Sequence, residues 1–333
     1  MMLPFALLLA SAVAIYLACE FFVNGVEWVG RKFKVSQNAT GSVLAAFGTA
    51  LPESVVTFVA VVFGAGPEQK ELGVGAAIGG PLALATVAYA VVGLTFILTK
   101  GKLDRHLFSR TSTQRLISDQ KWFMSIFVVK ITLGLVAFAI KPWLGILFLV
   151  AYGLYVRKKM QSVDEAGDEH EELESLKICP SSNNPSTGWA LLQCAGALVV
   201  IFFSSQLFVH QLETIGPWLG LPAQIVALLL SPIATELPEI LNAVIWVRQG
   251  KQNMALSNIS GAMMIQATIP SALGIFFTPW ILGHVLVWAA IVTMASILGL
   301  YFLLKHNKLT GSRLSWFGML YVIFAAGLYF IPF

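Results

Sequence analysis

Hydrophobic residues fill long stretches of the chain, and short polar segments separate them. A helix needs about 17–25 apolar residues to cross the hydrocarbon of a bilayer, and ten stretches come close to or meet this requirement. They are residues 4–30, 38–63, 72–98, 123–140, 143–157, 189–212, 223–247, 254–275, 279–304 and 314–332. The pattern predicts an all-α membrane protein with about ten transmembrane helices.

Composition and charge agree with this prediction. Of the 333 residues, 57% are hydrophobic and 11% are charged, whereas soluble domains average about 45–50% and 25%. If the N-terminus lies outside, every Lys and Arg except Lys70, Lys130 and Lys141 falls in a cytoplasmic segment, as the positive-inside rule requires. We therefore expect both termini outside, and the compact loops favour a bacterial plasma membrane.

The chain contains an internal repeat. Residues 19–64 align without a gap on residues 205–250, so that the sequence FGTALPE (Phe47–Glu53) matches IATELPE (Ile233–Glu239). Five predicted helices precede the second copy, and because five is odd the two copies must enter the membrane in opposite directions. Inverted repeats of this kind are typical of secondary transporters, which bind their substrate between the repeats near the middle of the membrane.

The repeat divides the chain into two five-helix halves. The first half covers residues 1–157 and contains repeat 1 at about 19–98, and the second covers 189–333 and contains repeat 2 at about 205–275. The linker at 158–188 is acidic, and we expect it to be cytoplasmic and solvated. It could sense cations, although a charged loop that keeps the halves apart explains its composition as well.

Each copy of the motif places a proline and a glutamate inside an apolar span. Proline has no amide proton, so Pro52 and Pro238 should each leave the carbonyl four residues earlier without its helical donor, and such an oxygen must face protein, water or a cation. A charged side chain at this depth costs from about 2.5 kcal/mol upward and marks a candidate site. Carboxylates and open carbonyls suit Ca²⁺, whereas helix contacts through protonated glutamates are the structural alternative.

The pattern G-T-x-L-P-E, repeated in inverted halves and followed each time by a helix of small residues, resembles the alpha repeats of the sodium/calcium exchanger family, which are calcium:cation antiporters. The resemblance implies a secondary active antiporter that exchanges Ca²⁺ for Na⁺ across the membrane. It further implies that inorganic cations are the partners, with no cofactor, no nucleic acid and no enzymatic activity. In that family the motif glutamates bind Ca²⁺ together with backbone carbonyls of the motif threonines, which implies roles for Glu53, Glu239, Thr49 and Thr235.

The chain also departs from the family pattern. Ala50 and Glu236 stand where relatives usually carry serine, and Leu84 stands where they carry a polar residue. Asn258 and Gln266 keep polar side chains in the partner helix of the second repeat, and Gln266 retains an oxygen where a relative would place Asn or Asp. We therefore expect a divalent site to be retained and the several Na⁺ sites of the family to be depleted.

Glu236 lies three residues before Glu239, which is about one helical turn. Like charges this close in a low dielectric cannot both ionise at low cost, so one carboxylate should hold a proton when no cation is bound. The alternative to Na⁺ coupling is therefore exchange of Ca²⁺, or another divalent cation, for H⁺. Glu236 could equally face a hydrated vestibule and take no part.

Lys130 falls within the fourth predicted span, where an unpaired ammonium is expensive. Three interpretations stay open: it pairs with a buried carboxylate such as Glu20, it occupies a monovalent-cation position, or it reaches the membrane surface along its flexible stem. Two rival functions also remain for the whole chain. One is an intramembrane enzyme that uses its buried carboxylates, and the other is a non-transporting relative that binds a cation as a sensor.

Overall fold

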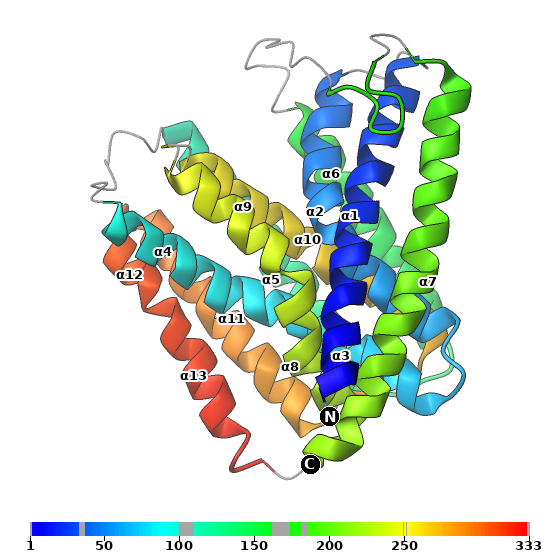
Figure 1. The fold of residues 1–333 in the computed structure, drawn as a ribbon. Helices are drawn as coiled ribbons and strands as arrows, with labels where there is room; N and C mark the ends of the chain where they lie inside the picture. The colour runs from blue at the N-terminus through cyan, green and yellow to red at the C-terminus, as the bar shows by residue number, and fades with distance from the viewer. Residues whose placement is uncertain are drawn as a thin grey trace.

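The chain forms a bundle of helices (Figure 1). The computed structural model describes residues 2–32, 37–99, 110–161, 174–181, 185–248, 250 and 252–331. It gives only the backbone of residues 2, 23, 27, 30, 32, 37–49, 110–112, 160, 161, 233, 234, 238 and 254. The α-helices are α1 (Met2–Lys32), α2 (Gln37–Val62), α3 (Pro67–Ala83), α4 (Tyr89–Leu98), α5 (Arg110–Leu135), α6 (Gly145–Gln161), α7 (Thr187–Leu219), α8 (Ala223–Thr235), α9 (Leu237–Arg248), α10 (Gln252–Phe277), α11 (His284–Lys305), α12 (Gly311–Ser315) and α13 (Phe317–Gly327). A π-helical turn, η1 (Leu84–Ala88), joins α3 to α4, and a 3₁₀ turn, η2 (Lys141–Leu144), precedes α6.

The predicted all-α membrane fold is confirmed, and the part of the chain that the structure describes contains no strand. By length and hydropathy, five stretches in this part qualify as membrane spans: Leu3–Val26, Pro67–Leu98, Thr187–Leu219, Ala255–Phe277 and His284–Lys305. Shorter apolar helices cover Ala50–Val62 and Ala223–Pro232. The predicted number of ten spans therefore stays a prediction.

The internal repeat is visible in the helices. The repeat offset of 186 residues places the bounds of α2 at residues 223 and 248, which are the first residue of α8 and the last residue of α9. The equivalent helices α1 and α7 pack along each other, and in Figure 1 α1 rises from the N-terminus whereas α7 descends. Helices related by the repeat thus run in opposite directions, as an inverted repeat requires.

The two copies of the motif differ in backbone structure. The first copy lies in α2, which continues through Pro52, whereas the second is interrupted between Thr235, where α8 ends, and Leu237, where α9 begins. Pro238 removes one helical hydrogen bond and disfavours helical geometry at the residue before it. Glu236 therefore sits at a helix junction and not within a continuous helix.

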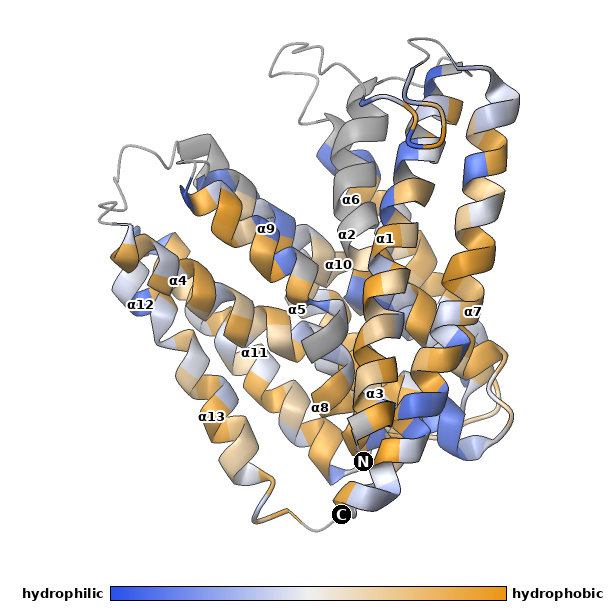
Figure 2. Cartoon of the chain, in the orientation of Figure 1, coloured by the Kyte–Doolittle hydropathy of each residue, from blue (hydrophilic) through white to orange (hydrophobic). Residues whose placement is uncertain are grey.

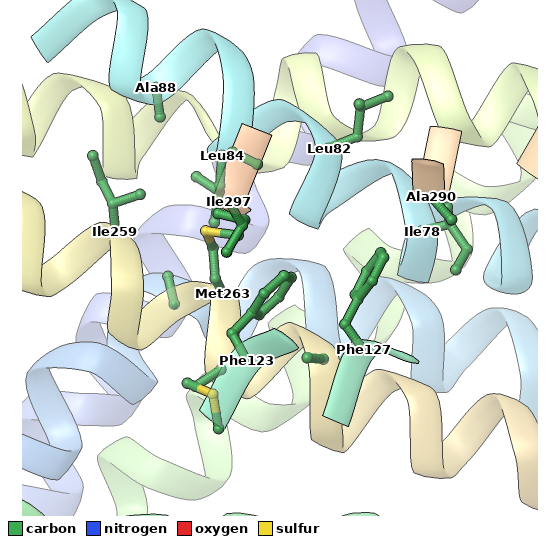
Figure 3. Close-up of a cluster of buried hydrophobic side chains, with 14 of the residues drawn as sticks. Ile78, Leu82, Leu84, Ala88, Phe123, Phe127, Ile259, Met263, Ala290 and Ile297 are labelled. Atoms are coloured by element: carbon green, nitrogen blue, oxygen red, sulfur yellow. The ribbon is translucent and has the colours of Figure 1, made fainter. Parts of the chain in front are cut away.

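Apolar side chains cover the outside of the bundle and fill its interior. Figure 2 shows hydrophobic residues along most of the helix surfaces, with hydrophilic residues gathered toward the helix ends. Large apolar side chains such as Leu191, Leu198 and Phe203 of α7 are exposed, as expected of a surface that faces lipid. Inside, the rings of Phe123 and Phe127 stack with centroids 4.9 Å apart (Figure 3).

Two glycines allow α3 and α8 to approach closely. A Cβ on Gly75 would lie 2.1 Å from the carbonyl oxygen of Gln224, and a Cβ on Gly79 would lie 2.6 Å from that of Leu228. The spacing of four residues puts both glycines on one face of α3, which is the pattern of close-packed membrane helices. This contact joins the first repeat to the second.

The end of the acidic linker is docked onto α1. The indole Nε1 of Trp28 donates to the carbonyl of Glu174 at 3.0 Å, the amide of Lys177 donates to Asn24 Oδ1 at 3.1 Å, and Leu176 is fully buried. Most side chains of this segment are exposed, as expected of a solvated linker, but its backbone and the side chain of Leu176 are held against α1. Most of the acidic run lies outside the described residues.

We expect Gly75→Ala to lower the stability of the bundle, because a methyl group cannot fit 2.1 Å from the Gln224 carbonyl and a forced separation of packed helices costs about 1–3 kcal/mol. The thermal midpoint Tm of the purified protein in detergent measures this effect. Gly153→Ala is the matched control, since a Cβ there meets nothing within 4 Å. Equal Tm values for the two variants would contradict the close approach.

Candidate functional site

Four of the predicted site residues meet in one hydrogen-bonded cluster, which we call the carboxylate cluster: Glu53 of α2, Thr235 at the end of α8, Glu236 at the junction and Gln266 of α10. The Thr235 hydroxyl donates to Glu53 Oε2 at 2.5 Å, and the Gln266 amide donates to Glu236 Oε1 at 2.8 Å. All four side chains are at most 3% exposed. The cluster joins both repeats at a place that is closed to solvent.

The Thr235 hydroxyl is surrounded by more acceptors than it can serve. Its oxygen lies 2.5 Å from Glu53 Oε2, 3.0 Å from the Ser231 carbonyl and 3.4 Å from Glu236 Oε1. A hydroxyl has one proton to donate, so at least two of these contacts bring oxygens together without a proton between them when both carboxylates are ionised. A proton on a carboxyl group, or a cation, would balance this excess of acceptors.

Three further oxygens of the cluster have no hydrogen-bond donor within the described residues: Glu53 Oε1, Glu236 Oε2 and Gln266 Oε1. Neither Glu53 nor Glu236 forms an ion pair with a described residue. Buried polar atoms are normally satisfied, and a set of open oxygens points to a missing ion or proton. The described residues hold no group of three or more His, Cys, Asp or Glu side chains that could hold a metal, so the candidate ligands combine carboxylate, amide and hydroxyl oxygens.

Gly80 of α3 forms a wall of the carboxylate cluster. A Cβ at this position would lie 2.8 Å from Gln266 Oε1 and 3.2 Å from Glu236 Oε1. The absence of a side chain therefore leaves room for these two oxygens. Neither this glycine nor Ser231, whose hydroxyl donates to Glu53 Oε2 at 3.2 Å, was predicted as a site residue.

Ser231 had a signal in the sequence. It precedes Thr235 by four residues, and residues four apart lie on the same face of a helix. A search for a second hydroxyl one turn before the motif threonine would have found it. The contact of Gly80 with the cluster depends on how α3 packs against α10, which no local pattern reveals.

The other predicted site residues are Glu239, Asn258 and Thr49. Glu239 is fully buried in α9, within electrostatic range of Tyr16 and Cys19 of α1. Asn258 lies eight residues before Gln266 in α10, about 12 Å along the helix axis at 1.5 Å per residue, and its amide nitrogen has no acceptor among the described residues. The side chain of Thr49 lies outside the described part of the chain.

Two interpretations of Lys130 are wrong. The side chain is completely buried, so it does not reach the membrane surface. Glu20 pairs instead with Lys177, at 3.0 Å. The ammonium of Lys130 donates to the backbone carbonyl of Ala77 in α3 at 2.9 Å.

Comparison with known proteins identifies the family. Residues 3–158 and 189–331 match the family described as sodium/calcium exchanger protein. The chain belongs to the sodium/calcium exchanger family. The resemblance that the two motif copies indicated is thereby confirmed, and the gap between the two matched segments coincides with the predicted linker.

Several relatives share this architecture over nearly their whole length. An uncharacterized membrane protein of Methanocaldococcus jannaschii is 23% identical over 321 residues, which cover 96% of each chain. The crystal structure of the H⁺/Ca²⁺ exchanger CAX matches 99% of this chain and 82% of its own, with 17% identity and a TM-score of 0.71. The sodium-calcium exchanger NCX_Mj matches 98% of both chains, with 22% identity and a TM-score of 0.59.

Membership of the family establishes the general class of the protein. It is a membrane cation antiporter of the calcium:cation type, and the family consists of transporters and not of enzymes. The prediction of inorganic cations as partners is confirmed at this level. The two solved structures show that the fold is that of membrane exchangers.

We expect Gly80→Ala to weaken cation binding, because the added methyl group would occupy the space beside Gln266 Oε1 and Glu236 Oε1. A ligand that binds only the folded state raises Tm by an amount that depends on the ratio of its concentration to its Kd. The Ca²⁺ concentration that gives the same rise in Tm should therefore increase by at least about tenfold, or about 1.4 kcal/mol of binding energy. Gly196→Ala is the control, since a Cβ there meets nothing within 4 Å. An unchanged Ca²⁺ response in Gly80→Ala would exclude a cation at this wall.

Proposed function

We propose that the protein is a secondary active antiporter that exchanges Ca²⁺ for H⁺ at the carboxylate cluster. One observation carries this proposal: Glu53 and Glu236 meet at the single hydroxyl of Thr235, at 2.5 and 3.4 Å, in a buried place. No described basic side chain forms an ion pair with either carboxylate. The charge that fixed protein groups leave uncompensated must therefore be balanced by ions from solution.

The chemistry of the cluster suits Ca²⁺ as the transported substrate. Calcium takes about 6–8 oxygen ligands and accepts carboxylates, carbonyls and water. The open oxygens of Glu53, Glu236 and Gln266 supply carboxylate and amide ligands, and Pro238 leaves the Ala234 carbonyl without its helical donor. The motif symmetry adds Glu239 and the carbonyls of Thr49 and Thr235 as proposed ligands.

Protons can replace Ca²⁺ on the same oxygens. An uncompensated carboxylate in a protein interior costs several kcal/mol, and two of them repel each other. A proton on Glu53 or Glu236 removes this charge and also provides a donor for the crowded Thr235 oxygen. Ca²⁺ and protons compete for the same atoms, so a low pH on one side of the membrane releases Ca²⁺ to that side. The site changes the side to which it is open only when Ca²⁺ or protons compensate its charge.

The π-helical turn η1 after α3 supports protons over Na⁺ as the coupling ion. Leu84, at the expected polar position of the family, is fully buried in the π-helical turn and lies in the hydrophobic cluster of Figure 3. Gln266 contributes no charge. Na⁺ coupling is the second candidate, and the open amide oxygen of Gln266 favours it, since a neutral oxygen ligand suits a monovalent cation.

Alternating access requires one part of the bundle to move past another. We propose that α1 and α7 move together, because they pack on each other and present apolar side chains, such as Ile15 and Phe208, to α2, α3 and α8. An apolar interface without ion pairs can slide in small steps. Such a shift would open the carboxylate cluster to one side and then to the other.

We further propose that the protein acts in a bacterial plasma membrane with both termini outside and the linker in the cytoplasm. The distribution of Lys and Arg supports this orientation. No resident cofactor and no nucleic acid is required for the exchange. A non-transporting cation sensor remains the alternative outcome of the transport experiment.

In proteoliposomes that contain the purified protein, an outward H⁺ gradient should drive ⁴⁵Ca²⁺ uptake, and dissipation of the gradient with an ionophore should abolish it. Glu53→Gln should reduce uptake to background, because a neutral amide cannot alternate between proton and Ca²⁺. Glu236→Gln should lower the response of uptake to the pH gradient by at least about tenfold. These rates are measured by filtration of the vesicles.

Glu68→Gln is the matched control, since Glu68 is exposed in the first turn of α3. This variant should transport Ca²⁺ like the unmodified protein. Uptake that requires an outward Na⁺ gradient and ignores the pH gradient would reject proton coupling and favour the second candidate. Ca²⁺ binding without flux under either gradient would identify a sensor.

A further inference from the structure

Lys130 of α5 forms a second polar centre that the exchange mechanism above does not use. Its side chain is completely buried, and its ammonium donates to the Ala77 carbonyl at 2.9 Å. The ammonium also lies 5.0 Å from the centroid of the Phe127 ring and 6.0 Å from that of Trp280. Both distances lie within the range in which the face of an aromatic ring attracts a cation.

The Ala77 carbonyl is available because of a proline. In an α-helix this oxygen would accept the amide proton of residue 81, but residue 81 is Pro81, which lies inside α3 and has no such proton. The sequence thus creates an open backbone oxygen in an apolar interior, where it needs a donor or a cation. The Lys130 ammonium meets this need from a different helix.

The wall opposite this carbonyl is held rigidly. Trp280 is fully buried and has a φ of 48°, which is strained for a bulky residue and persists only where the surroundings fix it. Its indole donates to the Lys130 carbonyl at 3.0 Å, its amide donates to Thr278 Oγ1 at 3.0 Å, and its carbonyl accepts from the Lys141 ammonium at 2.9 Å. The ammonium therefore lies in a preformed position.

This position lies about one helical turn from the wall of the carboxylate cluster, because Ala77 precedes Gly80 by three residues in α3. Within the described residues, Glu53 is the carboxylate close enough to interact with the charge of Lys130. The two do not form an ion pair within 4.0 Å in the described structure. A positive charge is thus fixed near the site without being a ligand of it.

We propose that the ammonium of Lys130 is a tethered cation, which fills a position between the Ala77 carbonyl and the rings of Phe127 and Trp280 that a free monovalent cation would otherwise occupy. Lys130 is then a specificity determinant, because it removes one position at which Na⁺ could bind and, while protonated, compensates part of the charge of Glu53. Its effect on the choice of coupling ion rests on the proposed function, whereas the existence of the cation position does not.

The test is the Tm of the purified protein in detergent, measured in NaCl and in choline chloride of equal ionic strength. The unmodified protein should have the same Tm in both salts. Lys130→Met keeps the length of the side chain but removes its charge. This variant should have a lower Tm in choline chloride than in NaCl. Its Tm should rise with the logarithm of the Na⁺ concentration above the Kd, and by about 2 °C when Na⁺ is at about ten times its Kd.

Two controls separate a cation position from a general effect of salt. Lys141→Met removes another buried lysine that bonds two carbonyls, those of Val136 at 2.7 Å and Trp280 at 2.9 Å, but has no carboxylate acting on it; its Tm should not respond to Na⁺. The double variant Lys130→Met with Glu53→Gln should lose the Na⁺ response, because the carboxylate that attracts the ion is gone.

The proposal is overturned if Lys130→Met and Lys130→Gln both fold and ignore Na⁺, or if the unmodified protein responds to Na⁺ as strongly as they do. If neither variant folds, solubilisation in methylammonium chloride decides the matter: recovery of folded protein supports a cation position, and no recovery rejects it. These measurements need no transport, so they remain informative if Ca²⁺/H⁺ exchange fails. If exchange is found, Lys130→Met should acquire Na⁺-driven ⁴⁵Ca²⁺ uptake that the unmodified protein lacks.

Discussion

A carboxylate inside an apolar bundle is stable only when its charge is compensated, and the construction of the site follows from this constraint. Two hydroxyls and one amide compensate Glu53 and Glu236 in part, but three oxygens of the cluster remain open. If protein donors satisfied every carboxylate oxygen, the site would have no ligand atoms left for an ion. If they satisfied none, burying the carboxylates would cost the folded state too much free energy. Partial compensation within a rigid scaffold is the condition under which Ca²⁺ and protons can replace each other.

Prolines supply the other half of this chemistry, because each one opens a backbone carbonyl one turn earlier. Three of these carbonyls meet three different kinds of neighbour in the structure. The Ala77 carbonyl before Pro81 accepts from the Lys130 ammonium at 2.9 Å, and the Gln266 carbonyl before Pro270 accepts from the Ser271 hydroxyl at 3.3 Å. The Leu228 carbonyl before Pro232 faces Gly79, whose missing side chain lets the two helices touch. The partner at each opening determines whether it serves the site or the packing.

The sequence was sufficient for those features that depend on local pattern. Apolar periodicity and the repeat predicted the helices and their inverted order, and the motif predicted Glu53, Thr235, Glu236 and Gln266. Contacts between distant helices could not be predicted this way. The partners of Lys130 and Glu20 were not predicted correctly, because they are distant in the sequence. Ala77 lies 53 residues from Lys130, and Lys177 lies 157 residues from Glu20. Only the packing of the bundle decides which of the buried groups come within reach of each other.

Glu236 and Lys130, two buried residues beside the motif glutamates, compensate each other in charge. Relative to a site with Glu53 and Glu239 alone, Glu236 adds one negative charge in the second repeat, and Lys130 adds one positive charge beside α3. The sum of these charges is therefore unchanged, but the charged groups behave differently. The ammonium is attached to the protein and cannot dissociate like a free cation, whereas the third carboxylate can take up a proton. A chain with both residues can keep a divalent site while it replaces exchange of Na⁺ by exchange of protons.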